Sequence, residues 1–127
     1  MFIVLKTQFA AFQRAAVDDF AERMVPHLAR TFPAESDALG EAGIRALIRL
    51  GIERAARHDL LQEYDVCLYL HVMLALGERF DDDPAISWAR AALDEADITA
   101  SIRIEQLHDR VFDDEDEDED EEGALFP

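Results

Sequence analysis

Apolar side chains recur at spacings of three and four residues along most of this chain, and that spacing is typical of amphipathic α-helices. The first such pattern predicts a helix over residues 7–30. Pro26 lies inside it and is expected to end or kink the helix at residues 24–25, because proline lacks the amide hydrogen that helix hydrogen bonding needs. Residues 2–5 are compatible with a short extended segment.

Two further helices follow in the pattern. Residues 34–40 are expected to form a loop or a single helical turn, and the second helix spans Glu41 to His58. The third helix, from Leu61 to Leu76, is apolar on nearly every side, which is typical of the buried centre of a bundle. Gly77 is well placed to end it, since glycine adopts a left-handed backbone without steric cost.

The last part of the pattern predicts two more helices. Asp83 and Pro84 suit the start of the fourth, whose apolar face includes Trp88. The fifth spans residues 98–111, with four positions expected to be buried: Ile98, Ile102, Leu107 and Val111. The fold class that follows is all-α, a single bundle of about five helices. It forms one domain over residues 1–112, which is long enough for one hydrophobic core.

The final fifteen residues break this pattern. Ten consecutive carboxylates run from Asp113 to Glu122, and a short end, residues 123–127, follows them. The net charge of the chain is −17, so the run leaves −7 on residues 1–112. A block of like charges repels itself and cannot pack. We therefore expect residues 113–127 to form a disordered acidic tail that increases solubility or attracts a basic partner.

The acidic balance also restricts the classes of partner. Nucleic acids and anionic membrane surfaces would be repelled, and no apolar run approaches the ~20 residues that a membrane-spanning helix needs. Cys67 is the only cysteine, so it is read as a small buried hydrophobe in a reducing compartment. We expect a cytoplasmic protein with a protein partner, no nucleic acid and no membrane.

Three adjacent carboxylates, Asp81, Asp82 and Asp83, form the sharpest local cluster. They directly precede a predicted helix, and its N-terminus has unpaired amide hydrogens that carboxylates can accept. A Ca²⁺ or Mg²⁺ site is the alternative. Calcium loops place oxygen ligands at alternate positions over about twelve residues with an internal glycine, and this segment has neither feature. The helix cap is therefore the preferred interpretation.

No pattern of catalytic or cofactor-binding residues stands out. The chain has four histidines: His27, His58, His71 and His108. No two of them are spaced as H-x-x-x-H, and a zinc centre would want more thiolates than one cysteine supplies. Nucleophile-elbow, P-loop and dinucleotide-binding motifs are also absent. We therefore expect no catalytic residue, no metal and no cofactor.

The second predicted helix has a basic face in an otherwise acidic chain. That face carries four arginines: Arg45, Arg49, Arg54 and Arg57. It is the best candidate for pairing with acidic groups, either in the bundle or on the tail. Aromatic side chains near the 81–83 cluster would mark a docking site if they were exposed. Six residues are predicted to bind a partner: Phe80, Asp81, Asp83, Trp88, Arg45 and Arg49.

Three stretches carry a resemblance to known proteins. They are residues 44–57 (IRALIRLGIERAAR), residues 64–70 (YDVCLYL) and residues 76–84 (LGERFDDDP), the last followed by Trp88 and Ala89. In these stretches the chain resembles small helical bacterial proteins encoded beside spike and effector components of type VI secretion systems. The resemblance covers most of residues 5–110 and does not extend to the acidic tail.

This resemblance implies a role in loading, chaperoning or neutralising a secreted effector. Together with the lack of catalytic motifs and the acidic tail, it favours a non-enzymatic protein-binding module, an adaptor or chaperone for a type VI secretion effector or spike component. The alternative is an immunity protein that neutralises a toxin with a basic surface, with the acidic tail as a nucleic-acid mimic. Complementary charge would speed the encounter in either case. A small enzyme or metal protein using residues 81–83 is a third hypothesis.

Overall fold

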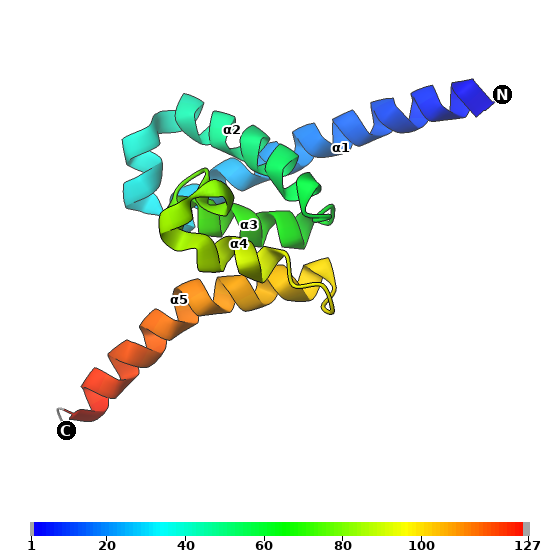
Figure 1. The fold of residues 1–127 in the computed structure, drawn as a ribbon. Coiled ribbons are helices and arrows are strands. Elements are labelled where there is room, and N and C mark those ends of the chain that lie inside the picture. The colour runs from blue at the N-terminus through cyan, green and yellow to red at the C-terminus, as the bar shows by residue number, and fades with distance from the viewer. Residues whose placement is uncertain (1, 126–127) are drawn as a thin grey trace. The chain divides into compact units, whose positions relative to one another are not determined.

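The computed structural model describes the backbone of residues 2–125 and the side chains of residues 14–112. Its elements are α1 (Phe2–Thr31), α2 (Pro33–Arg57), α3 (Glu63–Leu76), α4 (Ser87–Leu93) and α5 (Ala100–Leu125), with two short 3-10 helices, η1 (Phe80–Asp82) and η2 (Pro84–Ile86) (Figure 1). No strand occurs among residues 2–125. The predicted all-α class is confirmed.

The chain divides into two compact units, Met1–Arg49 and Leu50–Pro127, so the boundary falls inside α2. In the second unit α3 packs on α5, and α4 packs on α5 and η1. Asp65 of α3 accepts a hydrogen bond from Ser101 of α5, and His71 contacts His108 further along both helices. Because both contacts follow the same chain direction, α3 and α5 run parallel (Figure 1).

The first unit differs from the prediction at α1. Pro26 lies inside the helix, which continues to Thr31. Of the two alternatives expected at residues 24–25, a helix end is therefore wrong, and a kink stays a prediction. Met24 and Leu28 are buried on either side of Pro26, and their burial offsets the local cost of the missing amide hydrogen. The extended segment expected at residues 2–5 is also wrong, because these residues belong to α1.

The turn expected at residues 34–40 lies within the bounds of α2. Gly40 has φ 72° and ψ 169°, which breaks the helical path between Pro33–Leu39 and the rest of α2. Such a backbone strains any residue with a Cβ atom. Ser36, in the short first part, donates from Oγ to the Leu28 carbonyl at 3.0 Å. The helix predicted from Glu41 follows Gly40 as expected.

The apolar third helix forms the centre of the second unit, as predicted. Six of its apolar side chains are buried: Val66, Leu68, Tyr69, Leu70, Val72 and Met73. Gly77 follows it with φ 116° and ψ 152°, and its amide donates to the Met73 carbonyl. The positive φ was expected, but ψ lies outside the left-handed helical region, in a region that only glycine adopts readily.

The fifth helix shows one error in the predicted core. Ile102 is 46% exposed, whereas Ile104 is fully buried together with Leu107. Positions 104, 107 and 111 lie at spacings of three and four on one side of the helix, and position 102 is two residues out of that register. Val111 is buried as predicted. Ile98 precedes α5 and is half-buried.

The disorder predicted for residues 113–127 stays a prediction. The bounds of α5 extend to Leu125, but the side chains from 113 onward lie outside the described residues. Within the described part of the chain, no helix combines the length and apolar character needed to cross a membrane.

Gly51 allows a close approach between α2 and α3. A Cβ atom on Gly51 would lie 2.3 Å from Leu70 Cδ2 and 3.0 Å from Met73 Sδ, and both of these side chains are buried. Overpacking of this kind typically costs about 1–3 kcal/mol. That cost exceeds the gain of about 0.5–1 kcal/mol that alanine brings over glycine through its higher helix propensity. We expect Gly51→Ala to lower the free energy of unfolding, measured by urea denaturation.

Gly43 is the matched control for that substitution. It lies in α2 too, and a Cβ atom there would approach only Leu39, at 3.1 Å, on the other side of the break at Gly40. Gly43→Ala should therefore leave the free energy of unfolding unchanged or slightly raised. Equal effects of Gly43→Ala and Gly51→Ala would show that the close approach of α2 to α3 does not limit stability.

Candidate functional site

A buried ion pair joins the end of α2 to the turn after α3. Arg54 of α2 and Asp81 of η1 are each only 3% exposed, and Arg54 Nη2 donates to Asp81 Oδ1. The second carboxylate oxygen of Asp81 accepts from the Tyr69 hydroxyl at 3.1 Å and lies 2.9 Å from His58 Nε2. Because an ionised carboxylate only accepts, His58 Nε2 must carry the hydrogen. Four side chains thus share one buried centre.

The pKa values at this centre follow from burial and pairing. Burial acts to raise the pKa of Asp81, but the hydrogen bonds from His58 and Arg54 outweigh it and hold that pKa below the ordinary value. Burial, aided by the negative charge of Asp81, raises the pKa of Tyr69. The hydrogen bond to Asp81 raises the pKa of Arg54. All three groups therefore keep their usual protonation states near neutral pH.

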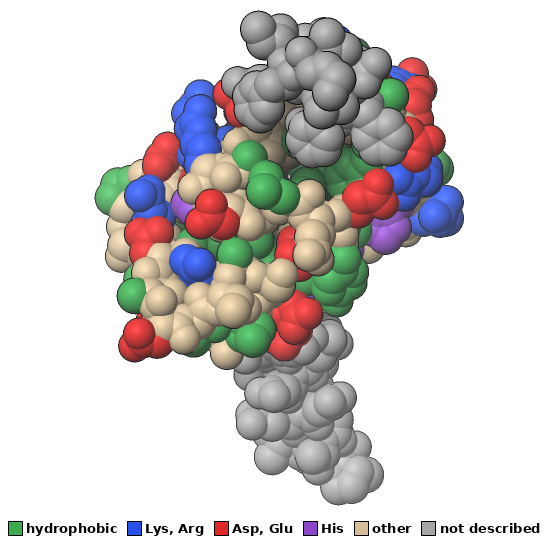
Figure 2. Space-filling model, turned by 90° about the vertical axis from the view of Figure 1, so that its right-hand side faces the viewer, with side chains coloured by type: hydrophobic (Ala, Val, Ile, Leu, Met, Phe, Trp, Pro, Cys, Tyr) green, Lys and Arg blue, Asp and Glu red, His purple; other side chains and the backbone are tan. Residues whose placement is uncertain are grey.

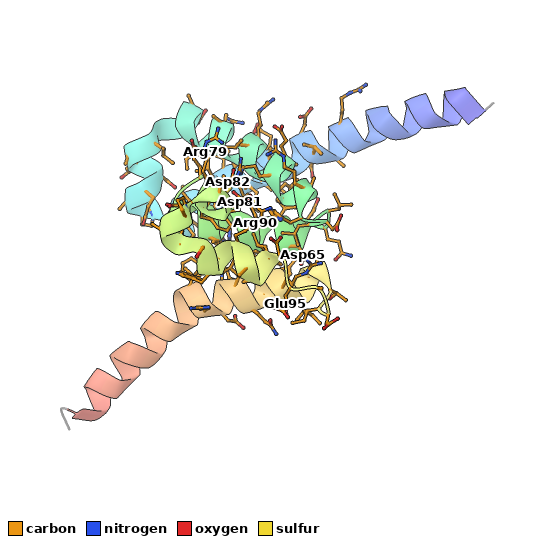
Figure 3. The ribbon with its side chains drawn as sticks, viewed as in Figure 1. Asp65, Arg79, Asp81, Asp82, Arg90 and Glu95 are labelled. Atoms are coloured by element: carbon orange, nitrogen blue, oxygen red, sulfur yellow. The ribbon has the colours of Figure 1, made fainter. Side chains whose placement is uncertain are left out.

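The neighbouring carboxylates have separate partners. Asp82 accepts from Arg54 at 2.7 Å and from Arg90 of α4 at 3.4 Å, and Arg90 also donates to the Asp81 carbonyl (Figure 3). Asp83 accepts from the Ala85 amide at 2.9 Å and caps η2. The cap interpretation therefore holds for Asp83. Asp81 is instead directed into the core.

A hollow of about 370 Å³ lies beside this turn. It is lined by Leu76, Gly77, Arg79, Phe80, Asp82, Asp83 and Pro84. The buried ion pair and the Arg90 contacts fix the turn that lines one side of the hollow. Its charged side chains are of both signs, which leaves it without a strong preference for one charge.

Two of the six residues predicted to bind a partner are not on the surface. Phe80 and Asp81 are buried, so they shape the turn from within rather than touch a partner. Asp83 and Arg49 are exposed. Trp88 is half-buried, and the Arg110 guanidinium stacks 4.3 Å from its ring centre. The role of this set in binding stays a prediction.

Most of the basic face predicted on α2 is neutralised locally. Arg54 is directed inward, which corrects its predicted place on the exposed face. Arg45 pairs with Glu22 of α1 at 2.5 Å and with Glu41 at 3.5 Å, and Arg57 lies 3.6 Å from Glu53. These arginines therefore pair with acidic groups of the bundle, which was one of the two expected locations; the other was the acidic tail. Figure 2 shows acidic and basic side chains interspersed on one face of the molecule.

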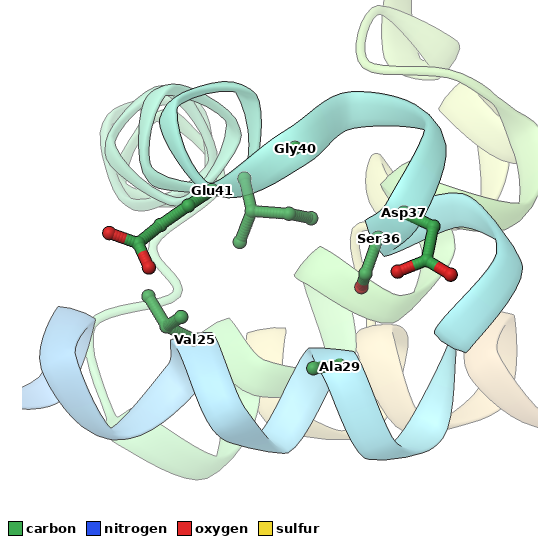
Figure 4. A pocket seen from close by; sticks show the side chains of 7 residues that line it. Val25, Ala29, Ser36, Asp37, Gly40 and Glu41 are labelled. Carbon is green, nitrogen blue, oxygen red and sulfur yellow. The ribbon is translucent and has the colours of Figure 1, made fainter.

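The first unit has a more acidic hollow between α1 and α2. Its volume is about 250 Å³, and it is lined by Val25, Ala29, Ser36, Asp37, Gly40, Glu41 and Ile44. Figure 4 shows Asp37 and Glu41 on opposite sides, with the apolar side chains between them. Both carboxylates are exposed. An apolar floor between two carboxylates suits the aliphatic stem and charged end of a lysine or arginine.

The sequence pattern did not predict one cluster, which consists of a thiol and two imidazoles. Cys67 Sγ lies 3.6 Å from His71 Nε2, and His71 Nδ1 lies 3.0 Å from His108 Nε2. The spacing of Cys67 and His71, four residues apart on a helix, was the available signal, because such residues share a face. His108 comes from α5 and carries no signal of this contact in its own segment.

Comparison with known proteins yields no family model, no curated protein and no solved structure that matches this chain.

Proposed function

We propose that this chain is a non-enzymatic protein-binding module that acts as an adaptor or chaperone for a type VI secretion effector or spike component. The observation that carries the binding role is the acidic hollow of the first unit, with Asp37 and Glu41 around an apolar floor. The secretion context rests on the sequence resemblance over residues 44–57, 64–70 and 76–84.

The charge of the molecule supports a partner with a basic surface. Even without the ten carboxylates from Asp113 to Glu122, residues 1–112 carry a net charge of −7. A basic side chain that entered the acidic hollow would bury its aliphatic stem on Val25 and Ala29 and place its charge near the two carboxylates. The overall negative field would speed the encounter, and the hollow would supply part of the specificity.

The direct test is binding to the product of the adjacent secretion gene, using the purified full-length chain and isothermal titration calorimetry. We expect the double variant Asp37→Asn with Glu41→Gln to bind about tenfold more weakly, since each exposed charge pair contributes up to about 1 kcal/mol. The loss should be larger at low salt, where screening is weaker.

The matched control removes two charges elsewhere. Glu95 and Asp97 are exposed in the segment between α4 and α5, and Glu95→Gln with Asp97→Asn changes the net charge by the same amount. If both double variants lose affinity equally, only overall charge matters and the hollow is not the site. If the parent chain binds no secretion protein, the adaptor role is excluded.

An immunity protein remains the second candidate, and the carboxylate run from Asp113 to Glu122 is the feature that favours it. Such a run could occupy the basic active site of a nuclease. Rescue of cells that express the adjacent toxin would separate this role from that of an adaptor. Neutralising Asp37 and Glu41 would then matter less than neutralising the run.

A further inference from the structure

Two parallel helices bring a thiol and two imidazoles together in the second unit. Cys67 and His71 lie one turn apart on α3, and His108 lies opposite them on α5. All three side chains are half-buried. The His108 and Phe112 rings are 4.6 Å apart, so an aromatic side chain covers one side of the cluster.

We propose that Cys67 and His71 bind a transition-metal ion of the Zn²⁺ class, with His108 as a positioning residue. The inference does not depend on the proposed adaptor function. It revises the expectation that the chain would bind no metal, which rested on the count of thiolates and on the spacing of histidines alone.

The distance between the two ligand atoms fits a shared ion. Tetrahedral zinc has Zn–S bonds of about 2.3 Å and Zn–N bonds of about 2.0–2.1 Å, which places sulfur and nitrogen about 3.6 Å apart. Cys67 Sγ and His71 Nε2 are 3.6 Å apart. A spacing of four residues on one helix directs both side chains to the same face. No large rearrangement of α3 is needed to bind the ion.

The contact with His108 supplies the outer hydrogen bond that such ligands require. A histidine that binds metal through Nε2 is neutral and carries its hydrogen on Nδ1, and that hydrogen usually has an acceptor. His108 Nε2 lies 3.0 Å from His71 Nδ1 and can accept it. The hydrogen bond would hold the imidazole in the tautomer and orientation that leave Nε2 directed toward Cys67.

A nucleophilic cysteine is the competing role for this cluster. A thiol beside an imidazole with a third orienting group resembles the arrangement of cysteine nucleophiles. A nucleophile, however, needs a hollow in which a substrate can reach the sulfur, and neither of the two hollows described above is lined by Cys67. The distance between Cys67 Sγ and His71 Nε2 fits a shared ion. The ligand role therefore fits the observations better.

Cobalt provides the test, because thiolate bound to Co²⁺ gives a near-ultraviolet charge-transfer band. Cys67 is the only cysteine, so that band reports on this site alone. Titration of the untagged full-length chain with Co²⁺, in excess Mg²⁺ to occupy the carboxylates, should give a band that saturates at one equivalent and is displaced by Zn²⁺. Cys67→Ser should abolish the band, and His71→Ala should abolish saturation at one equivalent.

The role of His108 has its own readout. His108→Ala should keep the band but weaken metal affinity about 10- to 100-fold, the usual effect of losing an outer hydrogen bond to a ligand. Circular dichroism checks that each variant stays helical. A measurement on the parent chain alone gives a second test, since Zn²⁺ should protect Cys67 from alkylation. A parent chain with neither a band nor protection would overturn the proposal, and so would unchanged affinity in His71→Ala.

Discussion

Asp81→Asn should lower the free energy of unfolding by about 3–5 kcal/mol, the usual cost of removing one partner from a buried ion pair. The substitution keeps the shape of the side chain but removes the negative charge that Arg54 faces in the core. Arg54 is 3% exposed, and its Nε already donates to no described atom. Its charge would stay buried, with the exposed carboxylate of Asp82 as its remaining ion-pair partner. Urea denaturation with a helical circular dichroism signal measures the change.

Asp83→Asn is the matched control, because it removes the same charge two residues away. Asp83 is exposed, and asparagine caps a helix as well as aspartate does. We expect the free energy of unfolding to change by no more than about 0.5 kcal/mol, as for most surface substitutions. If Asp81→Asn and Asp83→Asn had similar effects, the pair formed by Arg54 and Asp81 would not be a main source of stability.

The same pair predicts how stability depends on pH. The pKa of Asp81 is lower in the folded chain than in the unfolded chain, where it is about 4. Its contribution to stability is therefore fully present above about pH 4 and is lost as the pH falls through the lower, folded value. The difference in free energy of unfolding between the parent and Asp81→Asn should be constant above about pH 5 and should narrow below pH 4.

Phe80→Ala should lower the free energy of unfolding by a similar amount, about 3–5 kcal/mol. Phe80 is 1% exposed, and its ring lies 5.0 Å from that of Tyr69 at 49°. Its removal would leave a cavity under the turn and loosen the residues around the Asp81 carboxylate. Thermal and urea denaturation measure the loss, with Tyr64→Ala as the control, because Tyr64 is 63% exposed on α3.

The burial of Phe80 decides how binding experiments on the turn are interpreted. Loss of partner binding in Phe80→Ala would report on folding, since the side chain does not reach the surface. Arg49→Ala and Asp83→Asn are the informative variants of the predicted partner-binding set, because both residues are exposed. A Phe80→Ala variant with the stability of the parent would show that Phe80 is not a core residue.

The sequence pattern correctly predicted those helix ends that are set by neighbouring residues. The helix from Glu41 and the end of α3 at Gly77 appear where the spacing and the glycine indicate, because hydrogen bonds within a helix and glycine caps involve neighbouring residues. Pro26 shows the limit of such signals. Its local preference is overridden in α1, where buried side chains on both sides stabilise the helix.

The contacts that build the candidate sites depend on residues far apart in the chain. In the sequence, nothing distinguishes Arg54 from the exposed arginines of α2. It is a buried residue because it pairs with Asp81, which lies in a later turn. Ile102 and Ile104 are the same residue type, so only the position of α5 decides which one is buried.

The sequence by itself determined the helical class, the approximate helix bounds and the acidic charge, since each follows from residue type and short-range spacing. Only the tertiary structure decided which charges are buried, which side of α5 faces the core, and that Cys67, His71 and His108 meet. The physical reason is that burial and ligand geometry are set by packing between helices, and a single segment contains no information about what packs against it.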